Sequence, residues 1–228
     1  MQWWISDIHL GRGSSNEFQA PDELMAFLKA QPDHSGILNG DIFELLKDDK
    51  LEDIVAYWKD LVKLLFQKAK VYVVGNHDRF MLDSSFSPPQ FMGVPLCRYF
   101  IEGRIMSMHG HLFDPANIDF VGNHLFGDTI TGIVGWLSEN ITPDINELSR
   151  QLEKLVRNIG RNGDPSYYRV CALNFIEHVI VDWHRLDTII LGHTHIKEDK
   201  IIWNDRFTYY NTGTFGLAGH LDVLELPD

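Results

Sequence analysis

Five short clusters of polar residues contain the side chains best suited to bind metal ions. They are Asp7-x-His9, Gly40-Asp41, Gly75-Asn76-His77-Asp78, His109-Gly110-His111 and Gly192-His193-Thr194-His195. Carboxylate, imidazole and amide oxygen together form a donor set suited to Mn²⁺, Fe²⁺, Zn²⁺ or Co²⁺. One such cluster alone would be weak evidence for a metal site, because a lone Gly-Asp pair is usually just a turn. Five of them indicate a shared metal site.

The elements that must position these clusters are short strands, because each cluster directly follows a β-type run. We expect the first three strands at residues 3–6, 36–39 and 70–74. A helix beginning near Pro21 and an amphipathic helix from Leu51 to Leu65 separate them. Alternating strands and helices predict an α/β fold, and in open α/β sheets ligands collect at the carboxyl ends of the strands.

The second half of the chain has a different character. We expect further strands at residues 104–108, 188–191, 201–203, 207–210 and 221–226, the last four forming a second, more antiparallel sheet. Between them lie an apolar, glycine-punctuated stretch at 120–137 and two amphipathic helical patterns. We therefore predict a single domain over residues 1–228, with a helical insertion, or cap, at about 115–184.

Composition excludes several classes of protein. Hydrophobic residues make up 44% and charged residues 23%, which is typical of globular proteins and excludes a disordered chain. The net charge of −12 argues against a general nucleic-acid binder. Cys97 and Cys171 form no CxxC pair, which argues against a disulfide framework or a thiolate zinc site. With no bilayer-length apolar run and no signal-peptide pattern, we expect a cytoplasmic protein.

Taken in this order, the five clusters resemble the signature of the calcineurin-like metallophosphoesterase superfamily, which is D-x-H, G-D, G-N-H-[DE], H-G and G-H-x-H. The resemblance extends from Asp7 to His195. It implies a two-sheet β-sandwich flanked by helices and a centre of two divalent metal ions. Mn²⁺ is the expected metal, with Fe²⁺, Zn²⁺ and Co²⁺ as alternatives. The seven implied ligands are Asp7, His9 and His195 for one metal, Asn76, His109 and His193 for the other, and Asp41 as a bridge.

The resemblance also implies a reaction. A metal-bridging hydroxide would attack phosphorus in line with the leaving group. His77 would protonate the leaving oxygen, with Glu44 or Asp78 orienting its imidazole. His111 would lie close to the ligands without belonging to them. The residues expected to contact the substrate are Asn76, His77, Arg79, Arg157, Arg161 and His195.

Within the superfamily, residues 5–11, residues 39–44 and the insertion most resemble the UDP-2,3-diacylglucosamine hydrolases of lipid A synthesis. That similarity implies a lipid-linked pyrophosphate substrate, an acyl-chain groove at 120–137 and contact with the inner membrane surface. However, His77 stands where that group usually has arginine. Two alternatives stay open. One is a phosphodiesterase or phosphatase acting on a nucleotide, a phosphoprotein or a nucleic acid, and the other is an inactive scaffold with the same fold.

Overall fold

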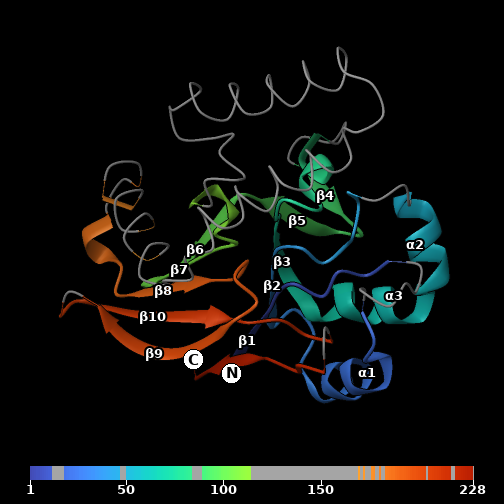
Figure 1. Ribbon diagram of the computed structural model, residues 1–228, viewed down its shortest axis with the longest axis horizontal. Coiled ribbons are helices and arrows are strands. Elements are labelled where there is room, and N and C mark those ends of the chain that lie inside the picture. The colour runs from blue at the N-terminus through green and yellow to red at the C-terminus, as the bar shows by residue number, and fades with distance from the viewer. Residues whose placement is uncertain are drawn as a thin grey trace, which may run out of the picture. The chain divides into compact units, whose positions relative to one another are not determined.

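Alternate side chains of the first strand enter two different hydrophobic cores. In the computed structural model, Trp3 and Ile5 of β1 (Gln2–Ile5) pack in one core with helix residues, whereas Trp4 packs in the other core. Successive side chains of a strand point to opposite faces, so β1 belongs to a sheet that is buried on both sides. The layers that bury it are helices on one face and a second sheet on the other (Figure 1).

The structure describes residues 1–11, 18–46, 50–83, 89–113, 183–203, 205–216 and 219–227, and single positions at 169, 172, 176, 177 and 180. The chain divides into two units. The first comprises Met1–His109 with Asp182–Asp228, and the second comprises Gly110–Val181. The predicted insertion at about 115–184 lies almost wholly outside the described residues, although positions 169, 172, 176 and 177 within it are helical.

Six strands form the first sheet, in the order β11-β1-β2-β3-β5-β4. The strands besides β1 are β2 (Gly36–Asn39), β3 (Ala69–Val73), β4 (Gln90–Phe91), β5 (Val94–Cys97) and β11 (Leu224–Leu226). β1, β2, β3 and β5 are parallel, and β4 and β11 pair antiparallel at the edges. The flanking helices are α1 (Pro21–Ala30), α2 (Leu51–Tyr57) and α3 (Lys59–Lys68).

Five strands form the second sheet, in the order β6-β7-β8-β10-β9. They are β6 (Tyr99–Glu102), β7 (Ile105–Met108), β8 (Thr188–Leu191), β9 (Lys197–Trp203) and β10 (Phe207–Thr212). β7, β8 and β10 are parallel, and β6 and β9 are antiparallel edge strands. Trp4, Ile37 and Val73 of the first sheet share a core with Ile190 of the second. The predicted α/β fold with two sheets and flanking helices is therefore confirmed.

Three details of the predicted elements are wrong. The second sheet includes the strand expected at 104–108, as β7, and its central strands β7, β8 and β10 are parallel. The last strand pairs with β1 in the first sheet rather than in the second, because Leu224 lies beside Trp4 and packs in the same core. The helix expected from Leu51 to Leu65 is broken into α2 and α3 at Trp58. The indole of Trp58 donates a hydrogen bond of 2.6 Å to the carbonyl oxygen of Gly11, a tertiary contact that helical periodicity does not reveal.

No helix in the described parts of the chain has the length and apolar character needed to cross a membrane.

The indole N–H of Trp4 donates to the Ser107 hydroxyl at 2.8 Å inside the core between the sheets. We expect Ser107→Ala to lower the free energy of unfolding by about 1–3 kcal/mol, because a buried donor then loses its partner. Ser35→Ala is a matched control. It removes the acceptor of the Trp3 indole at a half-buried edge, where water can replace it, so the expected loss is below about 1 kcal/mol. Urea denaturation measures the free energy of unfolding of both variants. Equal losses would contradict a special contribution from the buried Trp4–Ser107 hydrogen bond.

Candidate metal centre

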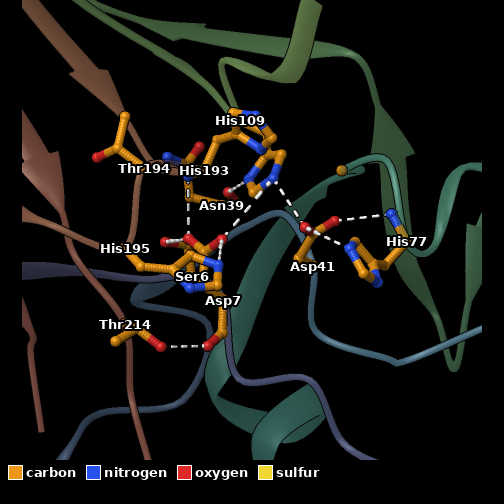
Figure 2. Close-up of polar contacts among 12 residues, drawn as sticks. Ser6, Asp7, Asn39, Asp41, His77, His109, His193, Thr194, His195 and Thr214 are labelled. Carbon is orange, nitrogen blue, oxygen red and sulfur yellow. Dashed lines mark hydrogen bonds and ion pairs between the residues drawn. The ribbon is translucent and has the colours of Figure 1, made fainter. Parts of the chain in front are cut away.

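The loops that leave five parallel strands bring the predicted ligands together. Asp7 and His9 follow β1, and Asp41 follows β2. Asn76 and His77 follow β3, His109 follows β7, and His193 and His195 follow β8. Because the carboxyl ends of parallel strands lie at one edge of a sheet, residues far apart in sequence meet there. In Figure 2, His109 lies between Asp7 and Asp41, and His77 lies on the far side of Asp41.

Asp7 turns one carboxylate oxygen toward three imidazoles. Its Oδ1 lies 3.1 Å from Nε2 of His195, 3.9 Å from Nε2 of His109 and 4.0 Å from Nε2 of His9. The other oxygen, Oδ2, accepts a hydrogen bond of 3.1 Å from the backbone N–H of His193. Ligand atoms of Asp7, His9 and His195 all lie within 4.8 Å of one another, close enough to share one cation.

Asp41 contacts both halves of the cluster. Its Oδ2 lies 3.1 Å from Nε2 of His109 and 3.9 Å from Nε2 of both His9 and His77. Ligand atoms of Asp41, His109 and His193 form a second group within 4.8 Å, and those of His9, Asp41 and His77 form a third. Asp41 thus belongs to two of the three groups, and its Oδ2 also lies near His9 of the first.

Two buried polar atoms test whether the cluster fits a cation. The Nδ1–H of His109 donates to the carbonyl oxygen of Asn39 at 2.9 Å, which leaves Nε2 directed at the carboxylates. The side-chain oxygen of Asn76 is buried and accepts no hydrogen bond from any residue that the structure describes. Buried polar atoms are costly when unpaired, so a cation is a natural partner for this oxygen. Carboxylate, imidazole and amide oxygen together fit divalent cations.

Glu44 holds two histidines at once. Its Oε1 lies 2.8 Å from Nδ1 of His77, and its Oε2 lies 3.3 Å from Nδ1 of His9. Both Nε2 atoms consequently face the carboxylates of the cluster. Asp78, the alternative partner considered for His77, instead accepts backbone hydrogen bonds from Ile42 at 2.8 Å and Gly75 at 2.7 Å. Asp78 therefore joins the loops after β2 and β3.

The backbone is strained at most of these positions. Asp7, His9, Asp41, His193 and His195 all have φ between 51° and 69°, in the left-handed region. Residues other than glycine adopt this region rarely, at a cost of about 1–3 kcal/mol each. Such residues persist only where the surrounding structure fixes them, and they cluster at functional sites. Here the strain turns short side chains back over the sheet edges toward one another.

Two glycines make room for this convergence. A Cβ atom at Gly40 would lie 2.3 Å from the imidazole of His109, and one at Gly75 would lie 2.1 Å from Oδ1 of Asp41. Both distances are far below van der Waals contact. The glycines of the Gly-Asp and Gly-Asn-His-Asp clusters are therefore required by the packing of the ligand side chains.

The electrostatics of the cluster balance anionic carboxylates against imidazoles. Burial raises the pKa of Asp41, but His109, His9 and His77 outweigh burial and hold this pKa well below its usual range. Burial lowers the pKa of His109, but Asp41 and Asp7 raise it to about 10. Burial likewise raises the pKa of Glu44, and its hydrogen bonds with His77 and His9 lower it overall. Without cations, the raised pKa of His109 keeps this imidazole protonated at neutral pH, and its charge offsets part of the carboxylate charge.

Three further residues were predicted to contact the substrate, Arg79, Arg157 and Arg161. Arg79 begins the 3-10 helix Arg79–Asp83, and its guanidinium carbon lies 5.1 Å from the ring centroid of Phe80. Arg157 and Arg161 lie outside the described residues, as does the apolar stretch at 120–137. His111 begins the 3-10 helix His111–Phe113 in the second unit.

Sequence reasoning missed a sixth polar run at a strand end, residues 211–214. Asn211, Thr212 and Thr214 are almost completely buried, and the Thr214 hydroxyl donates to the backbone carbonyl of Asp7 at 2.7 Å (Figure 2). The signal that found the other five clusters, polar residues directly after a β run, is also present here.

Comparison with known proteins identified one family. The sequence model of the family described as "Calcineurin-like phosphoesterase" matches residues 3–197, which includes every residue of the cluster. A search of the curated proteins gave no match.

Solved structures with a similar fold include three with low sequence identity. A Vps29 single mutant from Entamoeba histolytica is 16% identical with a TM-score of 0.45, over 99% of this chain and 86% of that one. A predicted phosphoesterase from Streptococcus pneumoniae is 16% identical with a TM-score of 0.33, over 93% and 72%. The phosphopantetheinyl hydrolase from Mycobacterium tuberculosis is 17% identical with a TM-score of 0.39, over 93% and 89%.

Metal affinity should rise with pH. The pKa of His109 is raised to about 10 in the metal-free chain, so at neutral pH a cation must displace a proton from this imidazole. Each displaced proton makes the affinity increase about tenfold per pH unit below that pKa. Mn²⁺ titrations of the metal-free protein between roughly pH 6.5 and 8.5 measure the slope. An affinity independent of pH would contradict a role for His109 as a ligand.

Proposed function

The chain belongs to the calcineurin-like phosphoesterase family and is a metal-dependent phosphoesterase, and from that premise we propose that its strand-end cluster is a binuclear hydrolytic centre. The observation that carries the proposal is the position of Asp41, whose Oδ2 lies near His109 of one ligand group and His9 of the other. A shared carboxylate of this kind is what a pair of cations requires.

Seven side chains would hold the two cations. Asp7, His9 and His195 form one set, and His109, His193 and Asn76 form the other, with Asp41 common to both. The first set is supported by mutual distances within 4.8 Å, and so are Asp41, His109 and His193 of the second. Asn76 is supported by its buried side-chain oxygen. Mn²⁺ is the proposed cation, and Fe²⁺, Zn²⁺ and Co²⁺ suit the same donors.

When bound, the cations would supply Lewis acidity toward phosphoryl oxygens and nucleophilic water at neutral pH. The chain's own contribution is orientation and proton transfer. Asn39 and Glu44 fix the Nδ1 protons of His109 and His9, so that each imidazole presents Nε2. Asn76 adds a neutral donor, which keeps the centre net positive and favours an anionic substrate.

His77 is the proposed general acid. Its imidazole is three-quarters buried, and Glu44 and Asp41 raise its pKa against the opposing effect of burial. Glu44 holds the Nδ1 proton, so the proton on Nε2 is the one available to the leaving oxygen. After that transfer His77 is a neutral imidazole, still bound to Glu44, and it regains its proton from solvent. Glu44 acts through His77 and is therefore a positioning residue.

We expect His77→Gln to lower kcat by about 10²–10⁴-fold for a phosphodiester with an alkyl leaving group, which needs a proton on departure. For a 4-nitrophenyl leaving group, which departs as a stable anion, the loss should be much smaller. Steady-state kinetics on both esters measure the two effects in one variant. His220→Gln is the matched control, because this exposed histidine lies outside the cluster and should leave both rates unchanged.

Metal content separates this role from metal binding. If His77→Gln lowers both rates equally while keeping its metals, the general-acid assignment is wrong. If the variant instead loses its metals, His77 is a ligand, as its distance of 3.9 Å from Asp41 would permit.

As the substrate of this centre we propose a UDP-2,3-diacylglucosamine-type pyrophosphate. Its support is the sequence resemblance at residues 5–11 and 39–44, which lie at the centre itself. The proposed acyl-chain groove at 120–137 and the proposed phosphate contacts Arg157 and Arg161 fall outside the described residues. A simple phosphodiester or phosphomonoester is the alternative, because His77 replaces the arginine usual in that group.

Substrate turnover distinguishes these alternatives. We expect Mn²⁺-dependent release of UMP from UDP-2,3-diacylglucosamine, abolished by a chelator, at a kcat/KM well above that for simple esters. If simple esters alone are hydrolysed, the binuclear centre stands and the lipid-linked substrate is wrong. If no phosphoester is hydrolysed although the metals are bound, the chain is a scaffold with a retained metal site.

A further inference from the structure

The polar run at residues 211–214 begins in the last two residues of β10 and continues into the loop that contacts Asp7. All four residues are buried. Asn211, Thr212 and Thr214 are between 0% and 2% exposed. The side-chain amide of Asn211 donates to the carbonyl oxygen of Gly192 at 2.9 Å and accepts from the N–H of Gly213 at 3.1 Å. Burying polar side chains is costly unless each is paired. Asn211 pairs with the carbonyl oxygen of Gly192, next to His193, and Thr214 pairs with the carbonyl oxygen of Asp7.

Thr212 connects to Asp7 through one other hydroxyl. Its Oγ1 lies 2.6 Å from Oγ of Ser6 and 3.0 Å from the carbonyl oxygen of Leu191. The Ser6 hydroxyl in turn donates to Oδ2 of Asp7. A hydroxyl has a single proton, and the charged carboxylate is the strongest acceptor within reach of Ser6. Ser6 therefore donates to Asp7, so its 2.6 Å contact with Thr212 is a hydrogen bond only if Thr212 is the donor. The single proton of Thr212 has two acceptors within reach, and Ser6 at 2.6 Å is nearer than the Leu191 carbonyl oxygen at 3.0 Å.

The second oxygen of Asp7 is consequently fully engaged. Oδ2 accepts from Ser6 and from the backbone N–H of His193, while Oδ1 faces the imidazoles. The contact is tight, because a Cβ atom at Gly192 would lie 2.7 Å from Oγ of Ser6 and 3.0 Å from Oδ2 of Asp7. Only a residue without a side chain can border this hydrogen-bonded pair.

We propose that Thr212 is a positioning residue, which acts through Ser6 to restrict Asp7 to a single metal-facing oxygen. The inference rests on the proposed binuclear centre and extends it to β10. Hydrogen bonds behind a ligand fix its orientation and typically change metal affinity by about 10–100-fold. Polarisation along the Thr212–Ser6–Asp7 chain also strengthens the bond to the carboxylate.

The test is a Mn²⁺ titration of the metal-free full-length protein, with the melting temperature measured before metal is added. Thr212→Val, which has nearly the same shape without the hydroxyl, should weaken Mn²⁺ binding about tenfold, and Thr212→Ser should restore it. Thr188→Val makes the same change at the start of β8, where the hydroxyl donates to the Asp187 carboxylate at 3.0 Å, and should leave affinity unchanged.

The double variant tests whether the two hydroxyls act in series. Ser6→Ala should weaken binding at least as much as Thr212→Val, and combining them should add little to the loss from Ser6→Ala alone. If Thr212→Val does not fold, Ser6→Ala still tests the proposal. Wild-type Mn²⁺ affinity in Ser6→Ala would show that the Thr212–Ser6–Asp7 hydrogen bonds do not position Asp7.

The outcomes separate this inference from the proposed function. If the wild-type protein binds no Mn²⁺, the proposed centre itself fails. If the wild type binds Mn²⁺ and Thr212→Val binds equally well, the positioning role is wrong. Equal losses in Thr212→Val and Thr212→Ser, or additive losses in the double variant, would also overturn it. A lower melting temperature with unchanged affinity would assign Thr212 to stability alone.

Discussion

Two buried carboxylates of like charge, Asp7 and Asp41, are the constraint on which the rest of the structure depends. Both are essentially inaccessible to solvent, and each raises the energy of the other's charged form. Burial of unpaired charge is expensive, so the site must supply positive charge. In the metal-free chain His109 supplies it, because its pKa is raised to about 10 and its Nε2 lies 3.1 Å from Asp41. Cations can replace this proton with the same ligands in place.

Holding this arrangement requires a rigid frame, and the two sheets provide it. Left-handed backbone at Asp7, His9, Asp41, His193 and His195 is tolerated because each lies two or four residues beyond a paired, buried strand. Side-chain hydrogen bonds then tie the loops to one another. Asp78 joins the loops after β2 and β3, and Thr214 joins the end of β10 to the loop after β1. The centre is thus positioned by backbone contacts from several strands.

Much of this could be predicted because the informative signals are local. Polar clusters directly after β runs mark the ends of parallel strands, and their residue types identify the chemistry, so the ligand candidates from Asp7 to His195 were recognised from sequence. The break at Trp58 and the pairing of Leu224 with Trp4 were missed because tertiary contacts decide them. The roles of Ser6 and Thr212 were missed for a related reason: hydroxyls acquire meaning only once the structure shows what they touch.

The central claim is that one chain holds two cations that share Asp41. Electron paramagnetic resonance of the Mn²⁺-loaded protein, combined with metal analysis, tests it most directly. The account predicts two Mn²⁺ per chain with the spectrum of a spin-coupled pair, and loss of the coupled signal in Asp41→Ala. A single uncoupled Mn²⁺ per chain, or a coupled pair that survives Asp41→Ala, would contradict it.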